Sequence, residues 1–131
     1  MEQSLKFTSS IENLSLVENL VEEISTNHII NEDMVGNVMV CITEAVTNAI
    51  EHGNKNDNSK NVYVNYKKIN DKLIFNVRDE GSGFDFNNIP DPTLPENIEK
   101  EDGRGVFLIK NLADSVKFEN NGSEIEFEFN L

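Results

Sequence analysis

Residues 31–53 read NEDMVGNVMVCITEAVTNAIEHG, and this segment predicts an amphipathic helix. Its apolar residues recur at helical spacing and form one stripe, at positions 35, 38, 39, 42, 45, 46, 49 and 50. Asn31 is suited to cap the helix, with Glu32 and Asp33 in the first turn. Gly53 marks the expected end, and residues 54–59 read as a loop.

The polar side of this helix gathers side chains that can carry chemistry. At about 100° per residue, one arc opposite the apolar stripe contains Glu44, Asn48, Glu51 and His52. A carboxylate can orient or deprotonate a hydroxyl, and an Asn oxygen is a hard ligand for a Mg²⁺ that also holds phosphates. A solvated helix face has the same pattern, so the helix alone leaves both interpretations open.

The flanking sequence predicts a sheet and two further helices. The expected elements are an opening strand around Leu5 and Phe7, a helix over 11–24, strands over 62–66 and 73–77, a helix over 106–113, and strands over 116–118 and 125–129. Asn121-Gly122 is a two-residue hairpin signal between the last two strands. This order predicts an α+β fold, mainly an antiparallel sheet with helices on one face, in a single domain over residues 1–131.

Two glycine segments lie at ends of these elements. Asp79 follows a strand and precedes Gly81 and Gly83, where glycine lets the backbone approach a ligand closely. An aspartate there can accept a hydrogen bond from an exocyclic amine such as that of adenine. An ordinary Gly-rich turn is the alternative.

The second glycine segment, Gly103-Arg104-Gly105, joins a long irregular stretch to the helix over 106–113. Free N–H groups at a helix start can bind an anion, and an arginine can add charged hydrogen bonds. The alternative is a plain loop end before a core helix. Neither glycine segment matches the P-loop or the dinucleotide-binding fingerprint.

Charge narrows the classes of partner. Eleven Lys and Arg against 24 Asp and Glu give a net charge of −13, which repels nucleic acid and anionic membrane surfaces. A protein partner is expected, and no nucleic acid or membrane. A nucleotide stays compatible, because Mg²⁺ and local N–H groups dominate a phosphate site.

Cysteine content and the N-terminal sequence favour a cytoplasmic protein. Cys41 is the one cysteine, so the chain cannot form an internal disulfide or a cysteine zinc cluster. The first six residues resemble no secretion signal, and the longest apolar run, Val38 to Ile42, is too short to span a bilayer.

In order and spacing, three segments resemble the sequence boxes of the GHKL ATPase superfamily, which includes gyrase, histidine kinases and mismatch-repair ATPases. Residues 44–53 resemble the asparagine box, residues 79–85 the first glycine box, and residues 103–109 the second. The asparagine box is most similar to that of the small bacterial anti-sigma-factor serine kinases. This resemblance implies a Bergerat-type two-layer α/β sandwich that binds ATP and Mg²⁺.

The resemblance also implies a role for each matching residue. Glu44 would be the catalytic general base, and Asn48 would ligate Mg²⁺. Asp79 would bind adenine in a pocket shaped by Gly81 and Gly83. The phosphates would meet Gly103, Arg104 and Gly105, and residues 84–104 would form the ATP lid.

The implied activity is a serine/threonine protein kinase that acts as an anti-sigma factor or similar partner-switching regulator. Its substrate would be a STAS-type anti-anti-sigma protein, with a sigma factor as a further partner and a homodimer as a compatible assembly. One alternative is a regulatory module that binds ATP and sequesters a partner without phosphoryl transfer. A detached histidine-kinase ATPase domain is less favoured, since His28 and His52 are the only histidines.

Overall fold

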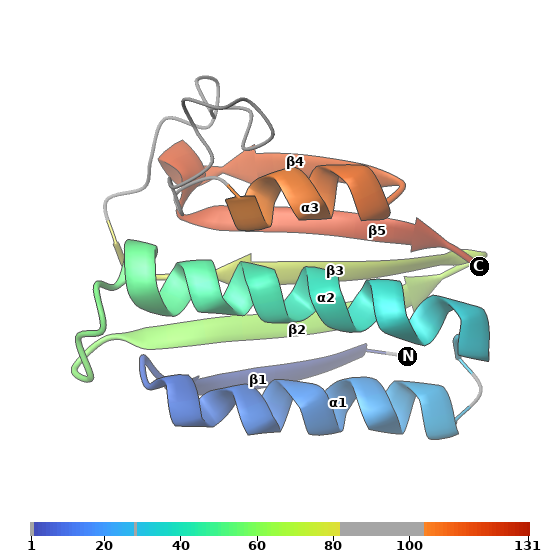
Figure 1. The fold of residues 1–131 in the computed structure, drawn as a ribbon, viewed down its shortest axis with the longest axis horizontal. Coiled ribbons are helices and arrows are strands. Elements are labelled where there is room, and N and C mark those ends of the chain that lie inside the picture. Colours follow the sequence, from blue (N-terminus) through green and yellow to red (C-terminus); the bar gives the residue numbers. More distant parts are fainter. Residues whose placement is uncertain (1, 28, 82–103) are drawn as a thin grey trace.

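The computed structural model describes residues 2–27, 29–81 and 104–131, which form two layers (Figure 1). One layer is an antiparallel sheet in the order β1-β2-β3-β5-β4, and the helices of the described residues lie together on one face of it. The strands are β1 (Glu2–Thr8), β2 (Asn61–Ile69), β3 (Lys72–Arg78), β4 (Ser115–Glu119) and β5 (Glu124–Asn130). The helices are α1 (Leu14–Thr26), α2 (Glu32–Asn48) and α3 (Arg104–Leu112). The expected α+β sandwich with a mainly antiparallel sheet is confirmed.

The core lies between the sheet and the helices. Alternate residues of the three central strands are buried, namely Val62, Val64, Tyr66, Leu73, Phe75, Val77, Ile125, Phe127 and Phe129. In the register of β3 with β5, Phe75 lies opposite Phe127, and their ring centroids are 5.5 Å apart. The period of two in the sequence thus turns one apolar face toward the helices.

The helices meet this face with apolar stripes. α1 contributes Val17, Leu20, Val21 and Ile24, and α2 contributes Val38, Cys41, Ile42, Ala45 and Val46. Burying one Val, Leu or Ile side chain fully is worth about 1.5–3 kcal/mol. Asn31 caps α2 as expected, because its side chain accepts a hydrogen bond of 3.1 Å from the Met34 N–H.

Cys41 is a free cysteine buried on the core side of α2. Burial, and then the negative charge of Glu44, raise the pKa of its thiol to about 12. The thiol therefore stays protonated in the folded chain at neutral pH.

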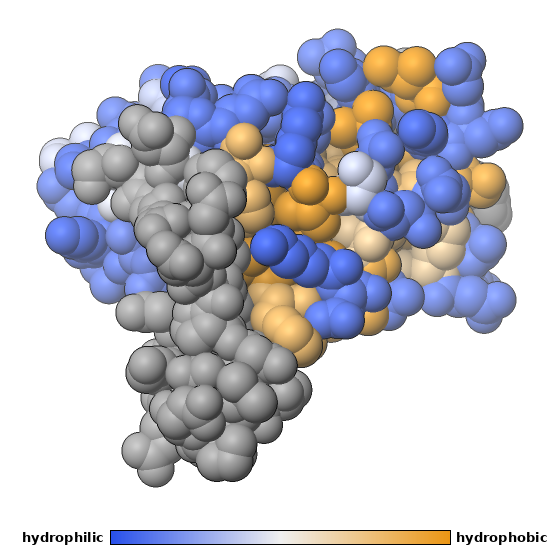
Figure 2. Space-filling view, turned by 90° about the horizontal axis from the view of Figure 1, so that it is seen from above, coloured by the Kyte–Doolittle hydropathy of each residue, from blue (hydrophilic) through white to orange (hydrophobic). Residues whose placement is uncertain are grey.

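The end of the sheet beneath α3 is only partly covered. Figure 2 views the molecule from the side on which α3 and β4 lie and shows apolar side chains between polar ones. Partly buried apolar residues of this region include Leu112, Ala113, Val116 and Phe118. α3 buries Ile109 over this end of the sheet, whereas Val116 and Phe118 of β4 stay partly exposed.

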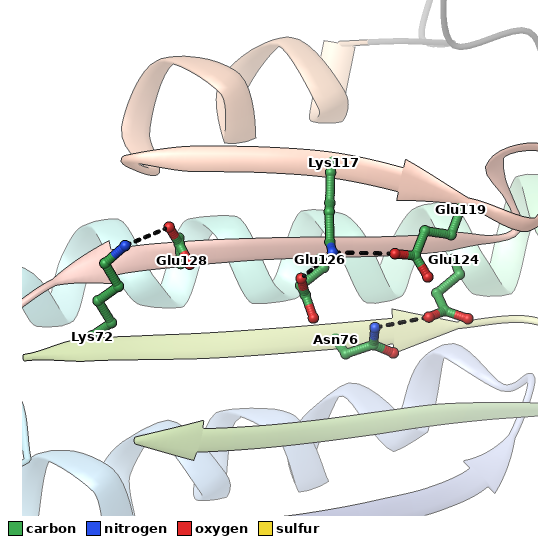
Figure 3. Close-up of polar contacts among 7 residues, drawn as sticks. All are labelled: Lys72, Asn76, Lys117, Glu119, Glu124, Glu126 and Glu128. Atoms are coloured by element: carbon green, nitrogen blue, oxygen red, sulfur yellow. Dashed lines mark hydrogen bonds and ion pairs between the residues drawn. The ribbon is translucent and has the colours of Figure 1, made fainter. Parts of the chain in front are cut away.

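The face of the sheet away from the helices is polar (Figure 3). Lys117 contacts Glu126 at 3.1 Å and Glu119 at 3.2 Å, while Lys72 contacts Glu128 at 3.4 Å. Such exposed ion pairs contribute about 0–1 kcal/mol each. They make this face compatible with water and add little to stability.

Two sequence predictions about local structure were wrong. The α-helix ends at Asn48, and residues Ala49–Gly53 form a wider π-helical turn. The arc drawn at about 100° per residue therefore does not continue to Glu51 and His52. The last hairpin closes through four residues, 120–123, because Asn120 takes a left-handed conformation (φ 52°) and its carbonyl accepts the Ser123 N–H.

The predicted lid over residues 84–104 stays a prediction, because residues 82–103 lie outside the described part of the chain. Of the lid, only the backbone of Arg104 at the start of α3 is described. Within the described ranges, no helix is both long and apolar enough to cross a bilayer.

Candidate functional site

The C-terminal part of α2 brings Glu44 and Asn48 against the start of α3. The two residues are one helical turn apart and share a face of α2. A Cβ atom added to Gly105 would lie 2.7 Å from Glu44 Oε2 and 2.9 Å from Asn48 Nδ2. Only a glycine permits this approach, so a carboxylate, a carboxamide and the N-terminal backbone of a helix converge at one point.

The π-helical turn directly after Asn48 directs Gly53 toward the end of β3. A Cβ atom on Gly53 would lie 2.2 Å from Asp79 Oδ2, and one on Gly81 would lie 2.0 Å from the carbonyl oxygen of Gly53. Two glycine backbones therefore enclose the Asp79 carboxylate. A π-helical turn is rare and is frequently found at functional sites.

Asp79 is held by hydrogen bonds as well as by packing. Its backbone N–H donates to the Ser123 carbonyl at 2.9 Å, which ties it to the start of β5. Its Oδ1 accepts the Gly81 N–H at 2.7 Å. The carboxylate thus keeps one fixed orientation at the strand end and retains lone pairs for a further donor.

Burial raises the pKa of Asp79 above its usual value, while the Gly81 N–H and the positive charge of Lys60 act in the opposite direction. Burial is the largest of these causes, so the folded chain disfavours the charged carboxylate. A ligand that donates a hydrogen bond to Asp79 would offset this cost. Perturbed carboxyl groups of this kind are typical of binding sites.

The structure thus assembles two clusters at the C-terminal end of α2. Glu44 and Asn48 meet Gly105, and five residues later Gly53 meets Asp79 and Gly81. These six residues include all five predicted site residues that the structure describes in full, which are Glu44, Asn48, Asp79, Gly81 and Gly105. Gly83, Gly103 and the side chain of Arg104 lie outside the described atoms.

Sequence reasoning missed the contact that Gly53 makes with Asp79 and the role of Asn54. Gly53 was expected only to end a helix, and Asn54 only to begin a loop, yet Asn54 is 1% exposed. Two of its side-chain partners, Ser9 and Glu80, are distant in sequence, so no local pattern identifies them. The signal that was present is position: Gly53 is the last residue of the asparagine box, and Asn54 follows it directly.

Comparison with known proteins assigns this chain to a family. The model of the histidine kinase-like ATPase domain matches residues 7–129, and the chain belongs to that family. Membership in an ATPase domain family implies that this chain binds ATP.

Among its relatives is a particular kinase. The serine-protein kinase RsbW of Staphylococcus aureus, for example in strains JH9 and Newman, is 28% identical over 119 residues, which cover 86% of this chain and 75% of RsbW. A solved structure of the RsbU and RsbW domains of Rv1364c from Mycobacterium tuberculosis has a TM-score of 0.63 at 13% identity. That match covers 98% of this chain and 31% of the other, and it shows a shared fold alone.

Proposed function

We propose that this chain is a protein serine/threonine kinase that transfers the γ-phosphoryl group of ATP to a hydroxyl of a partner protein in the cytoplasm. The observation that carries the proposal is the convergence of Glu44 and Asn48 on Gly105. The distant relationship to a serine-protein kinase supports the choice of a protein hydroxyl as acceptor. By the same relationship, the proposed substrate is a STAS-type anti-anti-sigma protein, and a sigma factor is a second partner.

The donor atoms present fit the needs of a magnesium nucleotide. Asn48 offers a neutral oxygen ligand, and Gly105, which has no Cβ, lets the ends of Glu44 and Asn48 lie against the start of α3, where backbone N–H groups can bind phosphate oxygens. When bound, Mg²⁺ would neutralise the negative charge that develops on the phosphates. Asp79, against which Gly53 packs, would accept the adenine amine, with Gly81 closing against the base.

Glu44 would carry out the one proton transfer of the reaction. The acceptor hydroxyl loses its proton to the Glu44 carboxylate as its oxygen forms a bond to the γ-phosphorus. The bond between that phosphorus and the bridging oxygen of ADP breaks, and ADP leaves with the electron pair. Such a step depends mainly on positioning and on charge neutralisation, which a rigid helix can supply.

The test is to combine the protein with a STAS-type protein as candidate substrate and with Mg-ATP labelled in the γ-phosphate. The proposal expects acid-stable label on one Ser or Thr of the partner. Glu44→Gln should bind ATP with affinity close to wild type and lose at least about 100-fold in transfer rate. Glu51→Gln, on the next turn, is the matched control and should transfer normally.

Two outcomes would contradict the proposal. If the protein binds ATP and the partner but transfers no phosphate, it is a regulatory module that uses ATP as a conformational ligand. If the label is acid-labile and lies on histidine, the chain is a histidine-kinase ATPase domain. Normal transfer by Glu44→Gln would remove the role of Glu44 as general base while leaving the kinase activity intact.

A further inference from the structure

A buried amide lies behind the Asp79 turn. Asn54 Nδ2 donates to Ser9 Oγ at 2.7 Å and to the Asn61 carbonyl at 3.0 Å, and Asn54 Oδ1 accepts the Glu80 N–H at 2.8 Å. Asn54 and Ser9 are each 1% exposed. One side chain therefore joins the segment after β1, the start of β2 and the turn after β3.

The backbone conformation places this amide in the interior. Asn54 N–H donates to the Ala49 carbonyl at 2.8 Å, closing the π-helical turn. Lys55 and Asn56 then both take left-handed conformations, with φ of 53° and 59°. A left-handed residue other than glycine costs about 1–2 kcal/mol. The fold tolerates this cost at Lys55, where the chain turns Asn54 inward, while Asn56 adopts the left-handed conformation more readily.

Asn54 is connected to the Asp79 carboxylate from two directions. Through the chain, it follows Gly53, whose backbone packs against Asp79. Through its side chain, it binds the N–H of Glu80, the residue between Asp79 and Gly81. The Glu80 carboxylate in turn accepts the Asn61 N–H, so the turn is fastened to β2 as well.

Ser9, which accepts a hydrogen bond from the Asn54 side chain, is itself held in place. Ser9 Oγ, which accepts the Asn54 amide, donates to the Lys60 carbonyl at 2.8 Å. No buried side-chain nitrogen or oxygen in the described part of the chain lacks a hydrogen-bond partner. A fully satisfied buried network is rigid, and removal of one member leaves the others unpaired.

We propose that Asn54 is a positioning residue of the adenine pocket, which sets the orientation of the Asp79 carboxylate and thereby the preference for a base with an exocyclic amine. This inference rests on the proposed function, in which Asp79 accepts the adenine amine. Because Asn54 is buried, it would act on the nucleotide only through Gly53 and Glu80, which lie on either side of Asp79. Ser9 supports it from the opposite side.

The experiment compares two nucleotides on the full chain by calorimetry. One is ATP, and the other is purine riboside triphosphate, which carries hydrogen in place of the amine. Wild type should prefer ATP. Asn54→Ala should reduce the ratio of the two dissociation constants about tenfold, with the affinity for the amine-free nucleotide changed less than about twofold. Asn76→Ala, which removes a hydrogen-bonded Asn from the open face of β3, is the matched control and should keep the ratio.

Ser9→Ala gives a second, milder test, because it removes the acceptor of one Asn54 N–H and leaves Asn54 in place. We expect a reduction of the ratio of about threefold. If Asn54→Ala does not fold, the ratio of the two dissociation constants measured for Ser9→Ala tests the inference in its place. A folded Asn54→Ala that keeps the wild-type ratio, or that weakens both nucleotides equally, would show a structural role alone and overturn the inference.

The failure of the inference and that of the proposed function are distinguishable. If wild type prefers ATP and the variants keep that preference, only the role of Asn54 is wrong. If wild type binds both nucleotides equally, Asp79 does not recognise the exocyclic amine, and the inference is refuted. The proposed phosphoryl transfer is not affected by that result. If wild type binds neither nucleotide, both proposals are refuted.

Discussion

Gly105→Ala is expected to impair nucleotide binding and phosphoryl transfer while leaving the fold intact. The new methyl group would lie 2.7 Å from Glu44 Oε2 and 2.9 Å from Asn48 Nδ2. An ordinary contact between such atoms is about 3.5 Å, so each group must retreat by roughly 0.6–0.8 Å. Both atoms are the far ends of side chains, which can move without displacing backbone.

The effect on stability should be small for the same reason. Alanine is favoured over glycine in a helix by up to about 1 kcal/mol, and this gain offsets the cost of moving two side chains. We expect the free energy of unfolding to stay within about 1 kcal/mol of wild type, which corresponds to a melting temperature within roughly 4 °C. A displacement approaching 1 Å of catalytic groups can lower a rate by about 100-fold, and we expect Mg-ATP affinity to fall about tenfold.

The assays are thermal melting, calorimetric titration with Mg-ATP and single-turnover transfer to the partner. Gly36→Ala is the control: Gly36 is exposed on α2 with no atom within 4 Å of its added Cβ, so stability should rise and binding should not change. Gly105→Ala with Mg-ATP affinity within twofold of wild type would refute the assignment of Glu44 and Asn48 to the phosphate site. A stability loss above about 3 kcal/mol would refute the reasoning that only side-chain ends must move.

Two further predictions concern Asp79 and the core. Asp79→Asn should weaken ATP binding and, at neutral pH, raise the free energy of unfolding. Burial raises the folded-state pKa of Asp79, so its contribution to stability is full below the unfolded pKa of about 4 and is lost as the pH rises through the folded pKa. Urea unfolding from pH 4 to 8 should show the advantage of the variant growing with pH; a constant difference would contradict it. Phe75→Ala, at the fully buried centre of the sheet, should cost about 3–5 kcal/mol in urea unfolding, whereas Lys68→Ala on the exposed end of β2 should stay within about 0.5 kcal/mol.

The parts of the fold that follow from local periodicity were predictable. The alternation in β2, β3 and β5 defines their buried face, and the Asn31 cap is readable because it acts within one turn. Glu44 and Asn48 are one turn apart, so their shared face follows from helix geometry alone. Their contact with Gly105 was expected only from the family resemblance, because no local rule brings together residues that are so far apart in sequence.

The features that the sequence predicted wrongly or missed depend on backbone conformation or on residues distant in sequence. A π-helical turn has no composition that separates it from an α-helix, so the arc was extended to His52 although α2 ends at Asn48. The closing hairpin depends on the left-handed conformation of Asn120, which the Asn-Gly signal placed one residue later. Ser9 and Glu80, two of the three side-chain partners of Asn54, are 45 and 26 residues away in sequence, so its role is visible only in three dimensions.

Alkylation of the buried Cys41 can report how readily the folded protein opens. A thiol that is 0% exposed with a pKa of about 12 cannot react with an alkylating reagent in the closed state. Its labelling rate therefore reports the openings that expose Cys41, without any engineered probe. A ligand that binds only the closed form slows that labelling in proportion to its own saturation. The half-life of Cys41 labelling thus reports how far a ligand occupies the site at Glu44, which is three residues away in sequence.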